Sequence, residues 1–166
     1  MKEIPWQTLQ MNPMDLIGHE WMLVTAGTEQ DGYNTMTASW GHLGYLWNKP
    51  TAIAYVRPQR YTKGFVDREA LYTLSFFPEG YKKQLTYLGT HSGRDEDKVA
   101  KMGLTTVFGE GYTTFAEAKL TLVCRKLYRA PILEECFLDK DVLEHNYPER
   151  DFHDLYVGEI VKVLVP

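Results

Sequence analysis

The chain of 166 residues is poor in cysteine, with only Cys124 and Cys136. Two cysteines do not make a disulfide framework, so we expect a protein of the reducing cytoplasm. Residues 1–6 have no apolar segment followed by a small-residue cleavage site and do not predict a signal peptide. No apolar run approaches the length of a transmembrane helix. The sequence therefore predicts a soluble cytoplasmic protein with no membrane contact.

Excess positive charge and the common catalytic motifs are also missing. The net charge is −4 and no basic run occurs, which argues against binding to nucleic acid or to anionic membranes. No GxGxxG, Walker loop or GxSxG is present. The five histidines lack HxH and HExxH spacing and the cysteines do not form CxxC, so the sequence gives no support to a metal site.

The overall composition is that of an ordinary globular protein, with 44% apolar and 24% charged residues. We expect a single domain over residues 1–166. Aromatic residues are frequent at 13%, with 11 tyrosines and 4 tryptophans. Such side chains can offer flat surfaces to a planar ligand or anchor a subunit interface, although core filling or simple exposure is the plainer account of any single one of them.

Strand patterns outnumber helix patterns along the chain. We expect strands at residues 21–27, 35–40, 51–56, 71–77, from 118 onward, at 132–138, 142–145 and 155–165, with Asp31-Gly32 marking a hairpin and 41–50 a loop. Short helices are expected near 14–18 and at 63–68, 82–88 and 96–102. Thr62 would cap the helix at 63–68, and Ser92 or Asp95 the helix at 96–102. Gly89 would end the helix at 82–88, and Gly103 the helix at 96–102. Because strands and helices do not alternate regularly, this set favours a mainly β fold, an antiparallel barrel with inserted short helices.

Three groups of residues have side chains suited to binding phosphate. Hydroxyl groups donate hydrogen bonds, and guanidinium groups match phosphate oxygens. Around residues 92–95 the start of a helix would add free N–H groups. Each group also has a plainer interpretation as a half-polar strand, a solvated turn or a capped helix start. The groups are Thr37 and Ser39; Arg57, Arg60 and Thr62; and Ser92, Arg94 and Lys98.

Several motifs in order resemble those of the flavin reductase-like family with the FMN-binding split barrel. They are Asn-Thr-Met-Thr-Ala-Ser-Trp at 34–40, Lys49-Pro50, Val-Arg-Pro-Gln-Arg-Tyr-Thr at 56–62, Gly-Thr-His-Ser-Gly-Arg-Asp-Glu-Asp-Lys at 89–98 and His-Asp-Leu-Tyr-Val-Gly-Glu-Ile at 153–160. The resemblance covers residues 21–165. It implies a split β-barrel of the antiparallel Greek-key type that forms a homodimer and binds FMN near the subunit boundary.

The resemblance also implies roles for individual residues. The segment 36–40 would pass along the flavin, Arg57 and the turn 60–62 would hold the phosphate, and the loop 92–98 would close over the cofactor. His153 corresponds to a histidine on the nicotinamide side, although residues 146–152 before it are bulkier and more charged than in relatives. The implied cofactor-binding residues are Met36, Thr37, Ala38, Ser39, Trp40, Arg57, Arg60, Tyr61, Thr62, Ser92, Gly93, Arg94, Asp95 and Lys98, and the implied catalytic residue is His153.

By this resemblance the protein is an FMN-dependent oxidoreductase that passes electrons from NADH or NADPH through the flavin to an acceptor. The flavin carries the redox chemistry, which is consistent with the lack of an acid–base or nucleophile motif. Two alternatives remain open at this point. One is a flavin carrier or electron-transfer protein of the same fold without a nicotinamide site, and the other is a split-barrel oxidase acting on a phosphorylated substrate.

Overall fold

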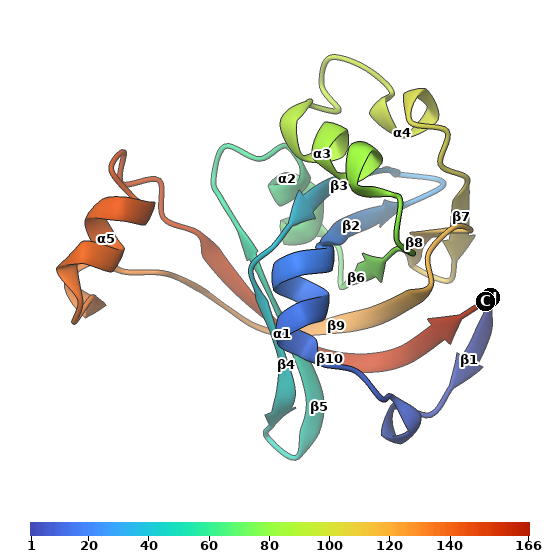
Figure 1. Ribbon diagram of the computed structural model, residues 1–166, viewed down its shortest axis with the longest axis horizontal. Helices are drawn as coiled ribbons and strands as arrows, with labels where there is room; N and C mark the ends of the chain where they lie inside the picture. Colours follow the sequence, from blue (N-terminus) through green and yellow to red (C-terminus); the bar gives the residue numbers. More distant parts are fainter.

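The computed structural model describes residues 1–166 and is built around one antiparallel sheet (Figure 1). Its strands run in the order β3-β2-β6-β9-β10-β5-β4, and β1 pairs with the end of β10. This arrangement confirms the predicted mainly β split barrel with short helices. The strands are β1 (Lys2–Ile4), β2 (Met22–Thr28), β3 (Gly32–Ala38), β4 (Gly41–Leu46), β5 (Lys49–Val56), β6 (Leu71–Phe76), β9 (Leu120–Pro131) and β10 (Asp154–Val165).

Short elements cover this sheet and extend from it. A separate hairpin consists of β7 (Thr106–Gly109) and β8 (Tyr112–Phe115). The α-helices are α1 (Pro13–Asp15), α2 (Thr62–Arg68), α3 (Lys82–Thr90), α4 (Lys98–Lys101) and α5 (Lys140–Asn146), with 3₁₀ turns at Trp6–Thr8 and Glu134–Cys136 and a π-helical turn at Leu16–Glu20. None of these helices is both long and apolar enough to span a bilayer.

The core lies against the inner face of the sheet, where 18 buried apolar side chains form one cluster. Tyr72 is 1% exposed, and its hydroxyl lies within hydrogen-bond distance of the carbonyls of Ala52 and Tyr156, 3.1 Å from each. Gly158 lets β10 approach this ring, because a Cβ there would lie 2.6 Å from the Tyr72 hydroxyl. A second cluster, which includes Leu23, packs α3 and α4 against the sheet.

The first half of the chain contains one correct and one wrong turn prediction. Asp31-Gly32 lies in the β2–β3 hairpin as expected. The expected loop at 41–50 is wrong, because β4 pairs along its whole length with residues 49–54 of β5 through a tight turn at Trp47 and Asn48. Both turn residues have positive φ, 53° and 58°. Glycine usually marks such a turn, so the bulky Trp-Asn pair concealed it.

The strands expected at 132–138 and 142–145 are also wrong. Residues 134–136 form a 3₁₀ turn, and α5 occupies the second range. The Asp139 carboxylate caps α5 by accepting hydrogen bonds from the N–H groups of Asp141 and Val142 at 2.9 and 3.3 Å. The β-branched Val142 suggested a strand, but the cap favours the helix. The segment 132–152 projects from the body as an arm that carries α5 (Figure 1).

Three helix boundaries differ from expectation as well. Thr62 is the first residue of α2 and makes no cap, and Gly89 lies inside α3. Neither Ser92 nor Asp95 caps α4, because the Asp97 carboxylate accepts from the Ala100 N–H at 3.0 Å. The loop at 92–95 is therefore not a helix start, and the helix dipole expected there is absent.

Candidate functional site

Three adjoining cavities lie where β3, β5 and the 89–98 loop meet. The basic cavity, of about 350 Å³, is lined by Asn34, Met36, Gln59, Arg60, Tyr61, Thr62, Thr90, His91, Ser92, Gly93, Arg94 and Lys98. The central cavity, of about 210 Å³, is lined by Met36, Thr37, Ala38, Ser39, Trp40, Tyr55, Arg57, Arg60 and His153. The two share Met36 and Arg60, so they form one continuous space. Every candidate residue from the sequence except Asp95 lines one of them.

Three cations in the basic cavity have no acidic partner. The Lys98 ammonium donates only to the carbonyls of Leu88 and His91, at 2.7 and 2.9 Å. Arg60 donates to the Gly89 carbonyl at 2.6 Å, and the Arg94 guanidinium lies 4.7 Å from the centre of the Tyr61 ring. The neighbouring Lys101, in contrast, pairs with the Glu96 carboxylate. The cavity therefore carries uncompensated positive charge.

Without a bound anion, burial of two of these cations destabilises the folded protein. Lys98 is 4% exposed, and desolvation together with the nearby Arg60 lowers its pKa to about 8. Desolvation, followed by repulsion from Arg57, also lowers the pKa of Arg60. A bound anion would offset both effects. The buried Lys98 ammonium, the half-buried Arg60 guanidinium, the exposed Arg94 guanidinium and the hydroxyls of Thr62 and Ser92 form a donor set that fits a phosphate group.

The walls of the basic cavity are held together by Asn34 on β3. Its side-chain amide donates to the Thr62 hydroxyl at 2.8 Å, which links β3 to the start of α2. The loop at Gly93 lies so close that a Cβ there would be 2.1 Å from the Asn34 carbonyl oxygen. Glycine at position 93 therefore lets the loop close onto β3, and Thr62 and Ser92 face the same space.

The central cavity is lined by rings and by a buried histidine. The His153 ring centre lies 5.1 Å from that of Trp40 and 6.4 Å from that of Tyr55. His153 Nδ1 and the Tyr147 hydroxyl are hydrogen-bonded at 2.8 Å. Desolvation, aided by the positive charge of Arg57, lowers the pKa of His153 to about 4, so the imidazole is neutral at pH 7. The cavity can thus accept a flat, uncharged group beside a neutral imidazole.

The structure separates Arg57, Thr37 and Ser39 from the basic cavity. Arg57 forms an ion pair with Asp151 and donates to the Asn146 carbonyl at 2.9 Å, so it holds the arm against the sheet. The Thr37 hydroxyl donates to the carbonyl of Leu85 in α3. All three line the central cavity, whereas Arg60 reaches both cavities.

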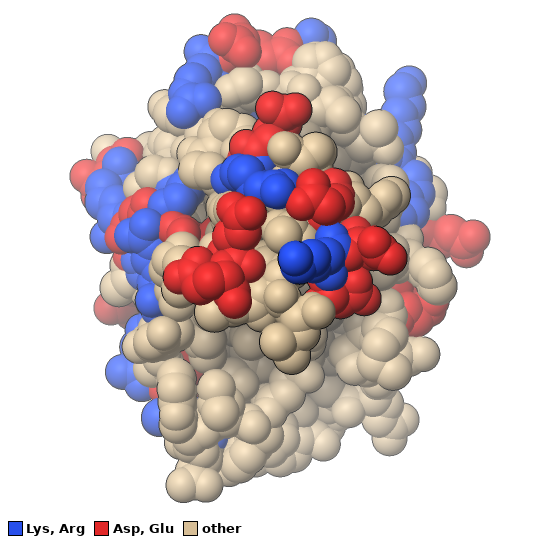
Figure 2. Space-filling model, turned by 90° about the vertical axis from the view of Figure 1, so that its left-hand side faces the viewer, with Lys and Arg blue, Asp and Glu red and all other residues tan.

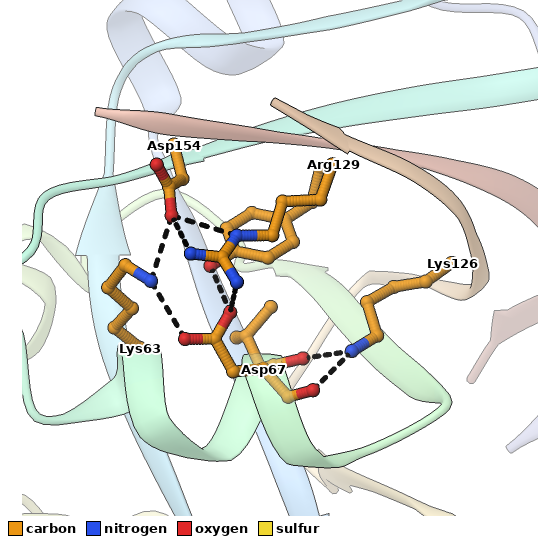
Figure 3. A network of polar contacts seen from close by, with 7 residues as sticks. Lys63, Asp67, Lys126, Arg129 and Asp154 are labelled. Atoms are coloured by element: carbon orange, nitrogen blue, oxygen red, sulfur yellow. Dashed lines mark hydrogen bonds and ion pairs between the residues drawn. The ribbon is translucent and has the colours of Figure 1, made fainter. Parts of the chain in front are cut away.

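A network of ion pairs fixes α2 to β9 and β10 (Figure 3). Lys63 lies 2.7 Å from Asp67 and 2.8 Å from Asp154, and the Arg129 guanidinium lies 2.6 Å from Asp154. Burial alone would raise the pKa of Asp154, but Lys63 and Arg129 hold it below its usual value. Because Arg60–Thr62 leads into α2 and His153 precedes Asp154, this network fixes one side of each cavity relative to the other.

A third, apolar cavity of about 830 Å³ opens beside the central one and shares Ser39, Trp40 and Tyr55 with it. The residues 13–18 form one wall, and the arm forms another. The remaining lining residues are Pro13, Met14, Ile17, Gly18, Gly41, His42, Leu43, Ile132, Leu133, Cys136, Phe137, Val142, Asn146 and Tyr147. The space therefore runs from a cationic end through a ring-lined middle to a wide apolar end.

Comparison with known proteins shows which family this chain belongs to. The family model described as the flavin reductase like domain matches residues 14–166. The chain belongs to the flavin reductase-like family. This confirms the resemblance found in the sequence and supports FMN as the cofactor. No curated protein matches the chain.

Several solved structures have the same fold at low sequence identity. Flavoredoxin of Desulfovibrio vulgaris (Miyazaki F) is 23% identical, with a TM-score of 0.68 over 88% of this chain and 69% of that one. An FMN-binding protein from Thermus thermophilus is 23% identical, with a TM-score of 0.68 over 100% and 82%. An NADH:FAD oxidoreductase of Streptomyces globisporus C-1027 is 17% identical, with a TM-score of 0.65 over 89% and 75%.

Sequence reasoning missed part of the cavity lining. Asn34 began one of the family motifs but was not assigned a role, and Tyr55 was assigned only to a strand. Thr90 and His91 lay within a motif, next to the residues that were chosen. The apolar cavity had no signal in the sequence, because its walls come from segments more than a hundred residues apart that the fold brings together.

Proposed function

We propose that the protein is an FMN-dependent oxidoreductase that takes electrons from NADH or NADPH and passes them to an acceptor. The observation that carries this proposal is the group of three cations without acidic partners, one buried, one half-buried and one exposed, placed next to a ring-lined cavity. FMN has a dianionic phosphate at one end and a flat ring system at the other. The family membership supports the same assignment.

In this proposal the basic cavity holds the phosphate. Arg60, Lys98 and Arg94 supply positive charge, and Thr62 and Ser92 supply hydroxyl donors. Tyr61 supports the Arg94 guanidinium, and Gly93 allows the loop to approach. Asp95 does not line either cavity, and its N–H donates to the Ser92 carbonyl at 3.2 Å. We therefore propose that Asp95 stabilises the loop conformation and does not contact the phosphate.

The central cavity holds the flavin ring system. Met36, Thr37, Ala38, Ser39 and Trp40 form the wall that runs along it. When bound, FMN supplies the redox chemistry by accepting two electrons and releasing them to an acceptor. Arg57 positions the arm through Asp151, and neutral His153 places a ring nitrogen at the cavity without adding charge. We propose His153 as the catalytic residue on the nicotinamide side.

A titration of the purified, FMN-loaded protein with NADH and with NADPH under anaerobic conditions tests this function. We expect the yellow absorbance of the bound flavin to bleach with one equivalent of one of the two nucleotides. A protein that binds FMN but keeps its colour with both nucleotides would contradict the oxidoreductase assignment.

One observation favours a second candidate, a flavin carrier or electron-transfer protein without a nicotinamide site. No charged side chain lines the apolar cavity, so that cavity offers nothing to pair with the diphosphate of a dinucleotide. The carrier predicts FMN binding without bleaching by either nucleotide, but reduction by dithionite. The same titration therefore separates the two candidates.

We also propose that the protein acts as a homodimer in the cytoplasm. Large aromatic side chains at the β4–β5 turn support the dimer, since Tyr45 is 64% and Trp47 55% exposed. Aromatic side chains are enriched at subunit interfaces.

A further inference from the structure

The apolar cavity differs sharply in charge from the two cavities beside it. Arginine and lysine line the basic cavity and arginine the central cavity, whereas no lysine, arginine, aspartate or glutamate lines the apolar one. Figure 2 shows the side of the molecule from which the arm projects, where charged side chains gather over the upper and middle parts and the left edge, and the lower central part carries few. An ion placed in this cavity would lose hydration without gaining a partner, so the cavity selects for a neutral molecule.

The size and lining of the cavity favour a flat ligand. Its volume of about 830 Å³ lies within the range of small-molecule sites. Four aromatic side chains, those of Trp40, Tyr55, Phe137 and Tyr147, line it. Such rings favour stacked or edge-on contacts with another aromatic ring.

Hydrogen-bonding groups stand where the apolar cavity meets the central one. The Tyr55 hydroxyl lies 3.1 Å from His42 Nδ1, and both residues line the apolar cavity. A tyrosine hydroxyl carries its proton at neutral pH, and burial raises the pKa of Tyr55 further. Tyr55 also lines the central cavity and can donate to a carbonyl oxygen placed between the two.

From these observations we infer that the apolar cavity is the binding site of the electron acceptor, a neutral, planar aromatic carbonyl compound of the quinone class. The inference rests on the proposed function for the source of the electrons. In the overall reaction NADH or NADPH is oxidised to its nicotinamide cation with the loss of two electrons and one proton. The quinone gains those electrons, that proton and a second proton from water, so that both of its carbonyls become hydroxyls.

Binding can be measured without turnover. Calorimetry of the oxidised, FMN-loaded protein with menadione, a neutral naphthoquinone, is carried out without NADH or NADPH and so reports binding at the site alone. We expect saturable binding of menadione and at least tenfold weaker binding of a naphthoquinone sulfonate. Absence of saturable menadione binding would overturn the inference, and so would equal binding of the two compounds.

Val142→Lys tests whether binding occurs in this cavity. Val142 lines the cavity and is 47% exposed, so a lysine is tolerated by the fold but places a charge at the apolar wall. We expect menadione to bind at least tenfold more weakly and the sulfonate more tightly. The matched control is Val161→Lys, because Val161 is 38% exposed and lines none of the three cavities. Equal effects of the two substitutions would overturn the assignment to this cavity.

The outcome of the nucleotide titration does not decide this test. If NADH and NADPH both fail to bleach the flavin while menadione binds and responds to Val142→Lys, the proposed electron donor is wrong and the acceptor site stands. If the flavin bleaches and menadione does not bind, the oxidoreductase stands and the acceptor site is wrong.

Discussion

At the scale of single residues, Lys98 shows most directly how the site is prepared for an anion. Its ammonium is buried, bonded only to carbonyls and close to Arg60, so its pKa falls to about 8. In the unfolded chain this lysine keeps its proton up to about pH 10.5, whereas in the folded protein it loses the proton near pH 8. Between these two values the unfolded state binds more protons, so the stability of the ligand-free protein rises as pH increases from 8 to 10.5. The folded protein thus bears the cost of this charge until an anion offsets it.

Lys98→Met removes that charge at similar volume. We expect FMN to bind more weakly by about tenfold or more, because a charge-assisted contact contributes roughly 1.5–3 kcal/mol. Wild-type affinity for FMN should also fall as pH rises above 8, and the variant should lack this dependence. Calorimetry between pH 7 and 9.5 measures both. The control Lys101→Met removes an exposed lysine of the same helix, and a similar loss there would contradict the role of Lys98.

His153→Ala separates a role at the nicotinamide side from a role in folding. We expect weaker use of the nucleotide with unchanged FMN content. The lowered pKa of His153 also means that its contribution to stability is complete above pH 6.5 and is lost as pH falls toward 4, by roughly 2–3 kcal/mol. Urea unfolding at pH 7 and 4.5 should show this loss in the wild type and not in the variant. Unchanged turnover in a stable, flavin-loaded variant would remove His153 from the site.

At the scale of elements, the site depends on how α2 is held against β9 and β10. Asp154 accepts from both Lys63 and Arg129, and Asp67 accepts from Lys63 and from the Tyr156 hydroxyl. The carboxylates keep α2, and with it the turn that bears Arg60, at a fixed distance from His153. Figure 3 shows these contacts, through which we expect the stability of the sheet to be coupled to the geometry of both cavities.

Asp154→Ala leaves Lys63 and Arg129 without one of their acidic partners. Because Asp154 is 8% exposed, we expect the free energy of unfolding in urea to fall by about 2–4 kcal/mol. The control Glu144→Ala breaks an exposed pair with Arg150 in the arm and should change stability little. Equal effects of the two substitutions would mean that the network does not stabilise α2.

The sequence predicted local elements well where they carry their own signal. The strands expected at 21–27, 71–77 and 155–165 match β2, β6 and β10, and Asp31-Gly32 identified a hairpin. The β4–β5 turn was missed because Trp47 and Asn48 adopt positive φ without glycine, and α5 was missed because its signal is a single capping aspartate. The site residues were predicted from family motifs. The different roles of Arg57 and Arg60 could not be predicted, because Arg57 is engaged by an ion pair with Asp151, and no local sequence pattern reveals that tertiary contact.

At the scale of the whole molecule, the exposed aromatic turn between β4 and β5 is the feature that is hardest to explain in a monomer. Trp47 has a φ of 53° and its side chain is 55% exposed, so a bulky residue occupies a position that favours glycine and gains little burial. Together with Tyr45 and Leu46 it forms an apolar tip on β4–β5, next to the wall of the apolar cavity that β4 supplies.

We therefore expect sedimentation of the FMN-loaded protein to give a dimer at micromolar concentration. Trp47→Gly should shift the equilibrium toward the monomer, because it removes an interface anchor while the turn keeps its conformation. A flavin-loaded monomer in the wild type at that concentration would contradict the dimer.

The central claim is that the three unpaired cations hold the phosphate of FMN, and a comparison of FMN with riboflavin tests it most directly. The two ligands differ only by that phosphate. With two charge-assisted bonds at roughly 1.5–3 kcal/mol each, calorimetry should show FMN binding about a hundredfold more tightly or better. Arg60→Ala should erase much of this difference by weakening FMN and sparing riboflavin, and Arg60→Lys should restore part of it. Equal affinities of the wild type for FMN and riboflavin would contradict the account.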